Sequence, residues 1–131
     1  MTQDSQSPPS LPTQELSLGK MYFEDARLLA HARRWEACLQ LLAVACRHAC
    51  RAVLASRGVP MIDYAGLPDR ALPGQIVACD VANALAESVA AVLNHARFAG
   101  YPDQPPVDRD VVKTRFFTTQ EILDYVQGCL G

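Results

Sequence analysis

Apolar side chains recur at intervals of three and four residues along most of this chain, a spacing that places them on one face of a helix. The first such run predicts a helix that begins between Gln14 and Leu18 and ends near Arg33. Six of the seven positions that share its face are apolar; the seven are Leu18, Met21, Tyr22, Asp25, Leu28, Leu29 and Ala32. Gly19 disfavours the beginning of this helix, so the pattern predicts it best from Lys20 onward.

A second run, from Trp35 to Arg57, consists almost entirely of Ala, Leu, Val and Cys. Gly58 and the Pro60 beyond it are typical of a helix end. The polar positions form a narrow stripe, made by Gln40, Arg47 and Arg51 with His48 beside them. A helix this apolar must be covered on most sides, so we expect it at the centre of the fold.

Two more helices are predicted toward the C-terminus. One runs from about Ile76 to Phe98 after a loop over residues 58–77, and the other runs from Thr118 to about Leu130. Thr118 and Glu121 fit a capping box, which marks the start of a helix. The expected inward positions are Val81, Leu85, Val89, Val92 and Ala96 in one helix and Ile122, Val126 and Cys129 in the other. Residues 100–110 are predicted as a loop, and residues 111–113 are too short a candidate strand to carry a sheet.

These elements predict an all-α fold, an antiparallel up-and-down four-helix bundle. We expect residues 1–15 to be a disordered or loosely packed tail, because they hold three prolines and little apolar material. Residues 16–131 then form a single helical-bundle domain, as a chain of 131 residues favours.

Composition narrows the function only slightly. The net charge is −2, from 12 basic and 14 acidic residues, whereas a dedicated nucleic-acid binder usually carries a basic excess. The five cysteines are an odd number and no secretory signal is evident, so we expect reduced thiols in a cytoplasmic protein. No run reaches the roughly 18 apolar residues of a membrane span, which argues against a membrane protein.

The order and spacing of several short segments resemble the HEPN family of small bacterial four-helix proteins. The resemblance covers roughly Tyr22 to Leu130. It rests on Arg34-Trp35, Ala37-Cys38, the helix end from Arg51 to Gly58, the turn Tyr101-Pro102-Asp103 and the closing segment Phe117 to Leu130. The resemblance implies a cytoplasmic bundle that is usually a homodimer and that binds nucleotides, accompanies a nucleotidyltransferase, or cleaves RNA without a metal.

The ribonuclease branch of that family carries an Arg followed a few residues later by a His at the end of the third helix. Arg97 stands in about that place, but no histidine follows it, since His31, His48 and His95 all precede it. We therefore expect a diverged member that lacks the ribonuclease motif.

Two groups of polar residues are candidate ligand-binding sites. Asn94, His95 and Arg97 lie at one helix end, where they can hold a phosphate or, alternatively, cap the helix C-terminus. Arg47 and Arg51, with His48, can face a phosphate or instead pair with Glu87 or with the aspartates after Gly100. The turn at Tyr101 is either a lip over a pocket or a stiff connector.

No metal site is expected, because Cys46 and Cys50 lack a second pair of ligands. No cofactor is expected either, since the sequence shows no phosphate-binding Gly loop, nucleophile elbow or pair of catalytic carboxylates. The favoured function is nucleotide- or nucleic-acid-associated binding without catalysis. The alternatives are a protein-interaction subunit, as a nucleotidyltransferase or toxin–antitoxin partner, and a metal-independent ribonuclease that uses Arg97 and His95.

Overall fold

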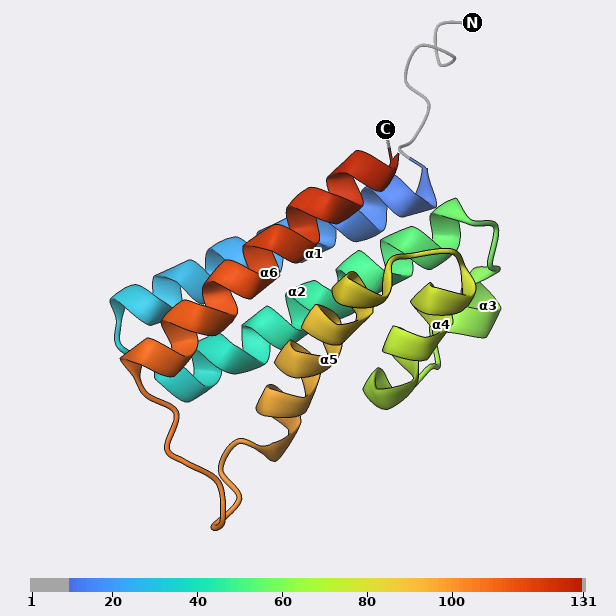
Figure 1. Ribbon diagram of the computed structural model, residues 1–131. Coiled ribbons are helices and arrows are strands. Elements are labelled where there is room, and N and C mark those ends of the chain that lie inside the picture. The colour runs from blue at the N-terminus through green and yellow to red at the C-terminus, as the bar shows by residue number, and fades with distance from the viewer. Residues whose placement is uncertain (1–9, 131) are drawn as a thin grey trace, which may run out of the picture.

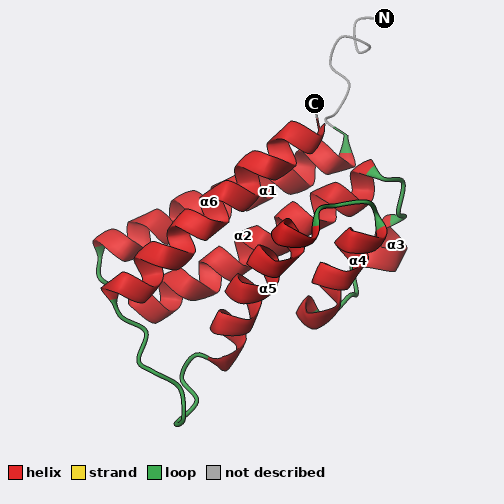
Figure 2. Ribbon diagram, in the orientation of Figure 1, coloured by secondary structure: helices red, strands yellow, loops and turns green. Residues whose placement is uncertain are grey.

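The computed structural model describes residues 10–130, and every regular element in that range is helical (Figure 2). The long helices are α1 (Leu11–His31), α2 (Trp35–Ser56), α5 (Asn83–Phe98) and α6 (Arg109–Leu130). The short ones are α3 (Met61–Tyr64), the 3₁₀ turn η2 (Asp69–Ala71) and α4 (Leu72–Ala78). The all-α class is therefore confirmed.

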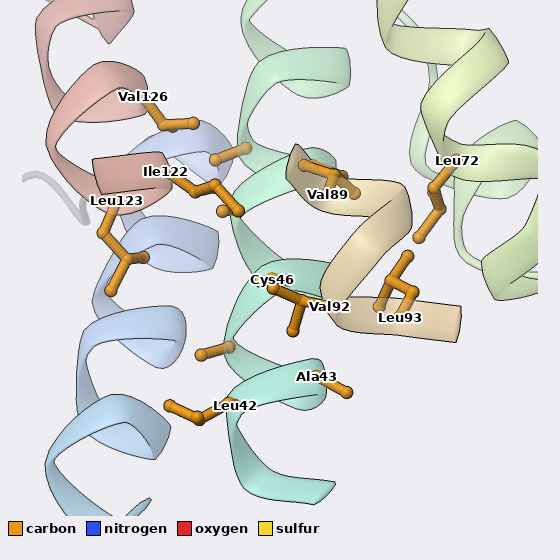
Figure 3. Packing of buried hydrophobic residues seen from close by; sticks show 14 of the residues in the cluster. Leu42, Ala43, Cys46, Leu72, Val89, Val92, Leu93, Ile122, Leu123 and Val126 are labelled. Carbon is orange, nitrogen blue, oxygen red and sulfur yellow. The ribbon is translucent and has the colours of Figure 1, made fainter. Parts of the chain in front are cut away.

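Helix α2 is the central element, as its apolar sequence predicts. It contacts α1, α6, α5, α4 and α3, while α1 and α6 also lie side by side (Figure 1). Leu42 and Cys46 of α2 are fully buried. Side chains of α5 and α6 surround this part of α2, among them Val89, Val92, Ile122 and Val126 (Figure 3). Ala and Cys at many α2 positions let the neighbouring helices approach closely enough to exclude water.

By length and apolar composition, α2 is the one helix of the described residues that would also suit a membrane span. Most of this apolar segment is buried by the other helices, and the core helix of a soluble protein can have the same length and apolar composition. There is therefore only weak support for α2 as a membrane-spanning helix.

Helix α1 begins earlier and buries a different face than its apolar pattern suggests. Ser10 caps it by accepting a hydrogen bond from the Thr13 amide at 3.4 Å, so residues 11–15 are helical and their assignment to a loose tail was wrong. Residues 1–9 of the predicted tail lie outside the described residues. The buried residues are Leu16, Gly19, Phe23 and Ala26, whereas Leu18, Met21 and Leu28 are exposed.

The predicted third helix is divided in two. Asp80 adopts a left-handed backbone conformation with φ of 64°, which ends the helical hydrogen bonding between α4 and α5. The expected loop over residues 58–77 accordingly contains α3, η2 and most of α4, so that part of the prediction was wrong. The predicted inward stripe from Val81 to Ala96 is buried at all five of its positions.

The last helix begins at Arg109, well before the predicted start at Thr118. The Asp108 carboxylate accepts a hydrogen bond from the Val111 amide at 3.0 Å, as an N-cap does. Thr118 instead donates its hydroxyl to the Thr114 carbonyl at 3.0 Å inside the helix. The predicted capping box was wrong because a threonine hydroxyl is satisfied equally well by the carbonyl one turn earlier.

Candidate functional site

The side chains predicted near the end of α5 do not converge on one ligand position. Asn94 is exposed, and the His95 Nδ1 accepts a hydrogen bond from the Arg115 Nε at 2.9 Å. Burial, and secondarily the charge of Arg115, lowers the pKa of His95, which favours the neutral ring. His95 is thus bound to α6 and leaves its Nδ1 unavailable to a phosphate.

Arg97 and Tyr101 both contact the ring of Phe98, which lies between them in the sequence. The Arg97 guanidinium lies 5.0 Å from the centre of the Phe98 ring, and Tyr101 meets the same ring edge-on at 5.6 Å. All three side chains are exposed. They form a small surface cluster rather than a pocket.

The arginines of the α2 stripe bind the chain's own loop. Arg47 forms a bidentate ion pair with Asp69, at 2.7 and 2.9 Å, and this hydrogen bonding lowers the pKa of the Asp69 carboxyl. Arg51 donates to the Ala65 carbonyl at 3.1 Å. Internal pairing therefore occurs, with Asp69 in the place of the expected Glu87 or loop aspartates.

The neighbouring His48 is also engaged within the fold. Its Nδ1 lies 2.9 Å from a carboxylate oxygen of Glu15, and its ring stacks on Tyr22 at a centroid distance of 5.5 Å. The pair joins α1 to α2. A ligand contact through the His48 Nδ1 would require this contact with Glu15 to open.

Metal and thiol chemistry find no support in the described part of the chain. No cluster of three His, Cys, Asp or Glu side chains suited to a metal occurs there. Burial raises the pKa of Cys38 to about 11 and that of Cys46 to about 12, which keeps both as thiols near neutral pH. The cysteines of α2 are core side chains.

A groove of about 570 Å³ opens where the end of α1, the start of α2 and the first half of α6 meet. Figure 1 shows these three helix ends together at one end of the molecule. The groove is lined by Arg27, Ala30, His31, Trp35, Arg109, Val112, Lys113, Phe116, Phe117 and Gln120. Its volume falls within the range of roughly 300–1,000 Å³ that small-molecule sites occupy.

A tight turn and the long α6 create this groove. Arg33 adopts a left-handed conformation with φ of 59°, and the Arg34 amide donates to the Leu29 carbonyl at 2.9 Å. This turn reverses the chain and sets Trp35 beside the last turn of α1. The first two turns of α6, which the sequence pattern did not predict, supply Arg109 and Lys113.

The electrostatic character of the groove is cationic. Arg27, Arg109 and Lys113 line it together with His31, and no Asp or Glu does. Arg27 is held in place by Glu24 at 3.2 Å and lies over the Phe116 ring at 5.2 Å. Among residues 10–130, neither Arg109 nor Lys113 forms an ion pair.

Aromatic surface completes the groove. Trp35 and Phe116 are half-buried, whereas the Phe117 side chain is 69% exposed. Exposed aromatic faces beside unpaired cations bind planar anions, by stacking on the ring and by charge on the anion.

Sequence reasoning missed the groove because it assigned residues 109–110 to a loop and residues 111–113 to a strand candidate, and it predicted no element over residues 114–117. Two basic pairs carried a usable signal. Arg27 and His31 are four residues apart, as are Arg109 and Lys113, and each pair therefore shares one face of its helix. The adjacent Phe116 and Phe117 also mark α6 as an unusual surface helix.

Comparison with known proteins leaves the family open. No family model matches the chain, no curated protein matches it, and no solved structure matches it. The resemblance to HEPN proteins stays a prediction.

Proposed function

We propose that this protein binds a nucleotide or a short single-stranded nucleic acid in the groove between α1, α2 and α6, without catalysing a reaction. The observation that carries the proposal is that Arg109 and Lys113, which form no ion pair among residues 10–130, line the same groove as the half-buried ring of Trp35 and the exposed ring of Phe117. The proposal also includes that the protein is a HEPN-like antiparallel four-helix bundle and that it is located in the cytoplasm.

In this proposal the cationic and the aromatic side chains of the groove contact different parts of the ligand. Arg109 and Lys113 attract the phosphates, while the base stacks on an aromatic ring, which contributes roughly 1–3 kcal/mol per base. Arg27 would contribute to both roles, because its guanidinium is cationic and already lies over the Phe116 ring. The groove would replace Asn94, His95 and Arg97 as the main phosphate site.

The overall charge of −2 is compatible with a local cationic groove, because attraction at this range is decided by the nearest charges. The expected affinity is modest, because only a few cations contact the ligand and their attraction to its phosphates weakens as the salt concentration rises. The Arg97–Phe98–Tyr101 cluster offers the same chemistry on a smaller, more exposed scale, and it is the second candidate surface for a longer strand.

The alternative function is a protein-interaction subunit, such as a nucleotidyltransferase or toxin–antitoxin partner. The exposed apolar side chains of α1 favour it. Ribonuclease activity is disfavoured because His95 is bound to Arg115, which separates its Nδ1 from any substrate at Arg97.

The test uses Trp35, which is the sole tryptophan of the chain and lines the groove. We expect its fluorescence to be quenched on titration with nucleotides or short single-stranded RNAs at low salt. Lys113→Glu should weaken binding at least tenfold, because it replaces an attraction with a repulsion at the phosphate.

Arg57→Glu is the matched control, because it makes the same change of charge at an exposed position at the opposite end of α2. It should change the affinity by less than about twofold, as distant charges are screened. Equal losses in Lys113→Glu and Arg57→Glu, or no quenching by any of these ligands, would exclude the groove as the site.

A further inference from the structure

The α6 wall of the groove presents three kinds of side chain in order along the helix. The cations Arg109 and Lys113 come first, the rings of Phe116 and Phe117 follow, and the amide of Gln120 comes last. Lys113 and Gln120 are about 10 Å apart by helix rise, which is comparable to the span of one mononucleotide from its phosphate to the far edge of its base. The wall is therefore ordered to meet a phosphate, the face of a base and the edge of that base.

Gln120 is oriented by a neighbouring carboxylate. Its Nε2 donates a hydrogen bond to the Asp124 Oδ1 at 3.0 Å. Because an ionised carboxylate only accepts hydrogen bonds, this contact turns the amide nitrogen, and not the amide oxygen, toward Asp124. Gln120 lines the groove, whereas Asp124 does not. The nitrogen is thus engaged outside the groove, and the Oε1, which accepts no hydrogen bond from residues 10–130, is left for a ligand.

The other polar side chains of the groove either donate hydrogen bonds only or lie at its opposite end. The two α6 cations and Arg27 of α1 have no acceptor atom. His31 can accept a hydrogen bond, but it lies at the end of α1, beside the first residues of α6, because the two helices run in opposite directions (Figure 1). At the Gln120 end, the amide oxygen is therefore the acceptor, and the matching group on a base is a donor.

We propose that the groove selects nucleotides whose base carries an exocyclic amino group, as adenine, cytosine and guanine do and uracil does not, and that the Gln120 Oε1 accepts a hydrogen bond from that group. This selectivity rests on the proposed function, because it concerns the base of a nucleotide bound in the groove. A base without a donor at that point leaves the Oε1 unpaired. Gln120 and Asp124 are exposed, so water competes for the Oε1 and the expected selectivity is severalfold.

The measurement compares two ligands that differ in the amino group alone. They are AMP and purine riboside 5′-monophosphate, in which hydrogen replaces the amino group, and both are titrated against the Trp35 fluorescence at low salt. AMP should bind at least about threefold more tightly, as one solvent-accessible hydrogen bond provides. In Gln120→Met the two dissociation constants should become equal. Gln75→Met is the matched control, since it makes the same substitution at an exposed position of α4, outside the groove, and it should preserve the difference.

Asp124→Ala tests the orienting contact. Without the carboxylate, the Gln120 amide is free to turn either end into the groove, so the preference for AMP should decrease. The readout is the ratio of the two dissociation constants, because removal of a negative charge changes the affinity for both phosphates alike. A ratio that Asp124→Ala leaves unchanged would overturn the orienting role of Asp124.

Two results would overturn the selectivity and leave the proposed function intact. One is equal binding of AMP and purine riboside 5′-monophosphate to the unaltered chain, and the other is a preference for AMP that Gln120→Met leaves unchanged. Absence of quenching by both ligands would also overturn the selectivity. If the short RNAs gave no quenching either, the proposed function would fall with it.

Discussion

At the scale of single residues, several charged side chains of this protein hold loops and helices in place. The ion pair of Arg47 with Asp69 fastens the segment between α3 and α4 onto α2. Both side chains are about one-third exposed, so the pair has partial protection from solvent. The same guanidinium that suggested a phosphate site in the sequence thus stabilises the fold.

The Arg47–Asp69 pair should make stability depend on pH in a defined direction. Because Arg47 lowers the pKa of Asp69 in the folded state, the pair stabilises the fold when the carboxyl is ionised. That contribution is complete above the ordinary carboxyl pKa of 3.8 and is lost as the pH falls through and below it. Asp69→Asn should lower the free energy of unfolding by about 1 kcal/mol at neutral pH, as removal of a partly exposed pair does.

Urea denaturation of both proteins between about pH 7 and pH 3 measures this effect, and the difference between them should shrink toward acid. Asp103→Asn is the control, since Asp103 is exposed in the loop before α6 and forms no ion pair within residues 10–130. A constant difference across this pH range would contradict the assignment of the effect to the Asp69 carboxylate.

At the scale of elements, Gly19 determines how closely α1 approaches its neighbours. A Cβ at this position would lie 3.2 Å from the Ala45 carbonyl oxygen of α2 and 3.3 Å from the Leu123 side chain of α6. From sequence, Gly19 appears only as a poor helix former. In the structure its missing side chain is what allows three helices to meet.

We expect Gly19→Ala to destabilise the protein by about 1 kcal/mol, because separating packed helices costs more than the helix propensity that alanine adds. Gly128→Ala is the matched control in α6, where nothing lies within 4 Å of the added methyl group. It should stabilise the protein by about 0.5–1 kcal/mol through propensity alone. Thermal unfolding of the two variants gives opposite shifts if this is correct, and equal shifts would show that Gly19 has no packing role.

The elements also show what the sequence could and could not predict. Periodicity correctly indicated α2 and the buried side of α5, because both are decided by runs of apolar residues that no other signal opposes. It missed the break at Asp80 because a left-handed residue other than glycine carries no clear sequence mark. The start of α6 was missed for a different reason: Thr118 imitates a helix cap, whereas Asp108 is the cap that forms.

The candidate site was less predictable than the fold. Arg97, Arg47 and Arg51 were identified as basic residues near a helix end or along a stripe, and each contacts its own chain or a neighbouring ring instead. The groove depends on the turn at Arg33 and on the correct start of α6. Neither can be read from residue types alone, because both are settled by tertiary packing.

At the scale of the whole molecule, α2 joins the other helices into one core. The three cysteines of α2 are at most 2% exposed; they are Cys38, Cys46 and Cys50. Cys79 and Cys129, outside α2, are half-buried. Burial also raises the pKa of all three α2 thiols. Their reactivity should therefore report how the core opens.

We expect two thiols to react rapidly with a thiol reagent in the native protein and three to react at least about a thousandfold more slowly, since the slow reaction requires unfolding. The three slow reactions should accelerate as the denaturant concentration rises. If α2 is uncovered in a single cooperative step, the rates of all three should depend on denaturant concentration in the same way. A chain with Cys79→Ser and Cys129→Ser should retain only the slow phase. If Cys38, one helical turn after the groove residue Trp35, instead reacts ahead of Cys46 and Cys50, the groove end of the molecule opens separately from the core, and α2 does not unite the helices into one cooperative unit.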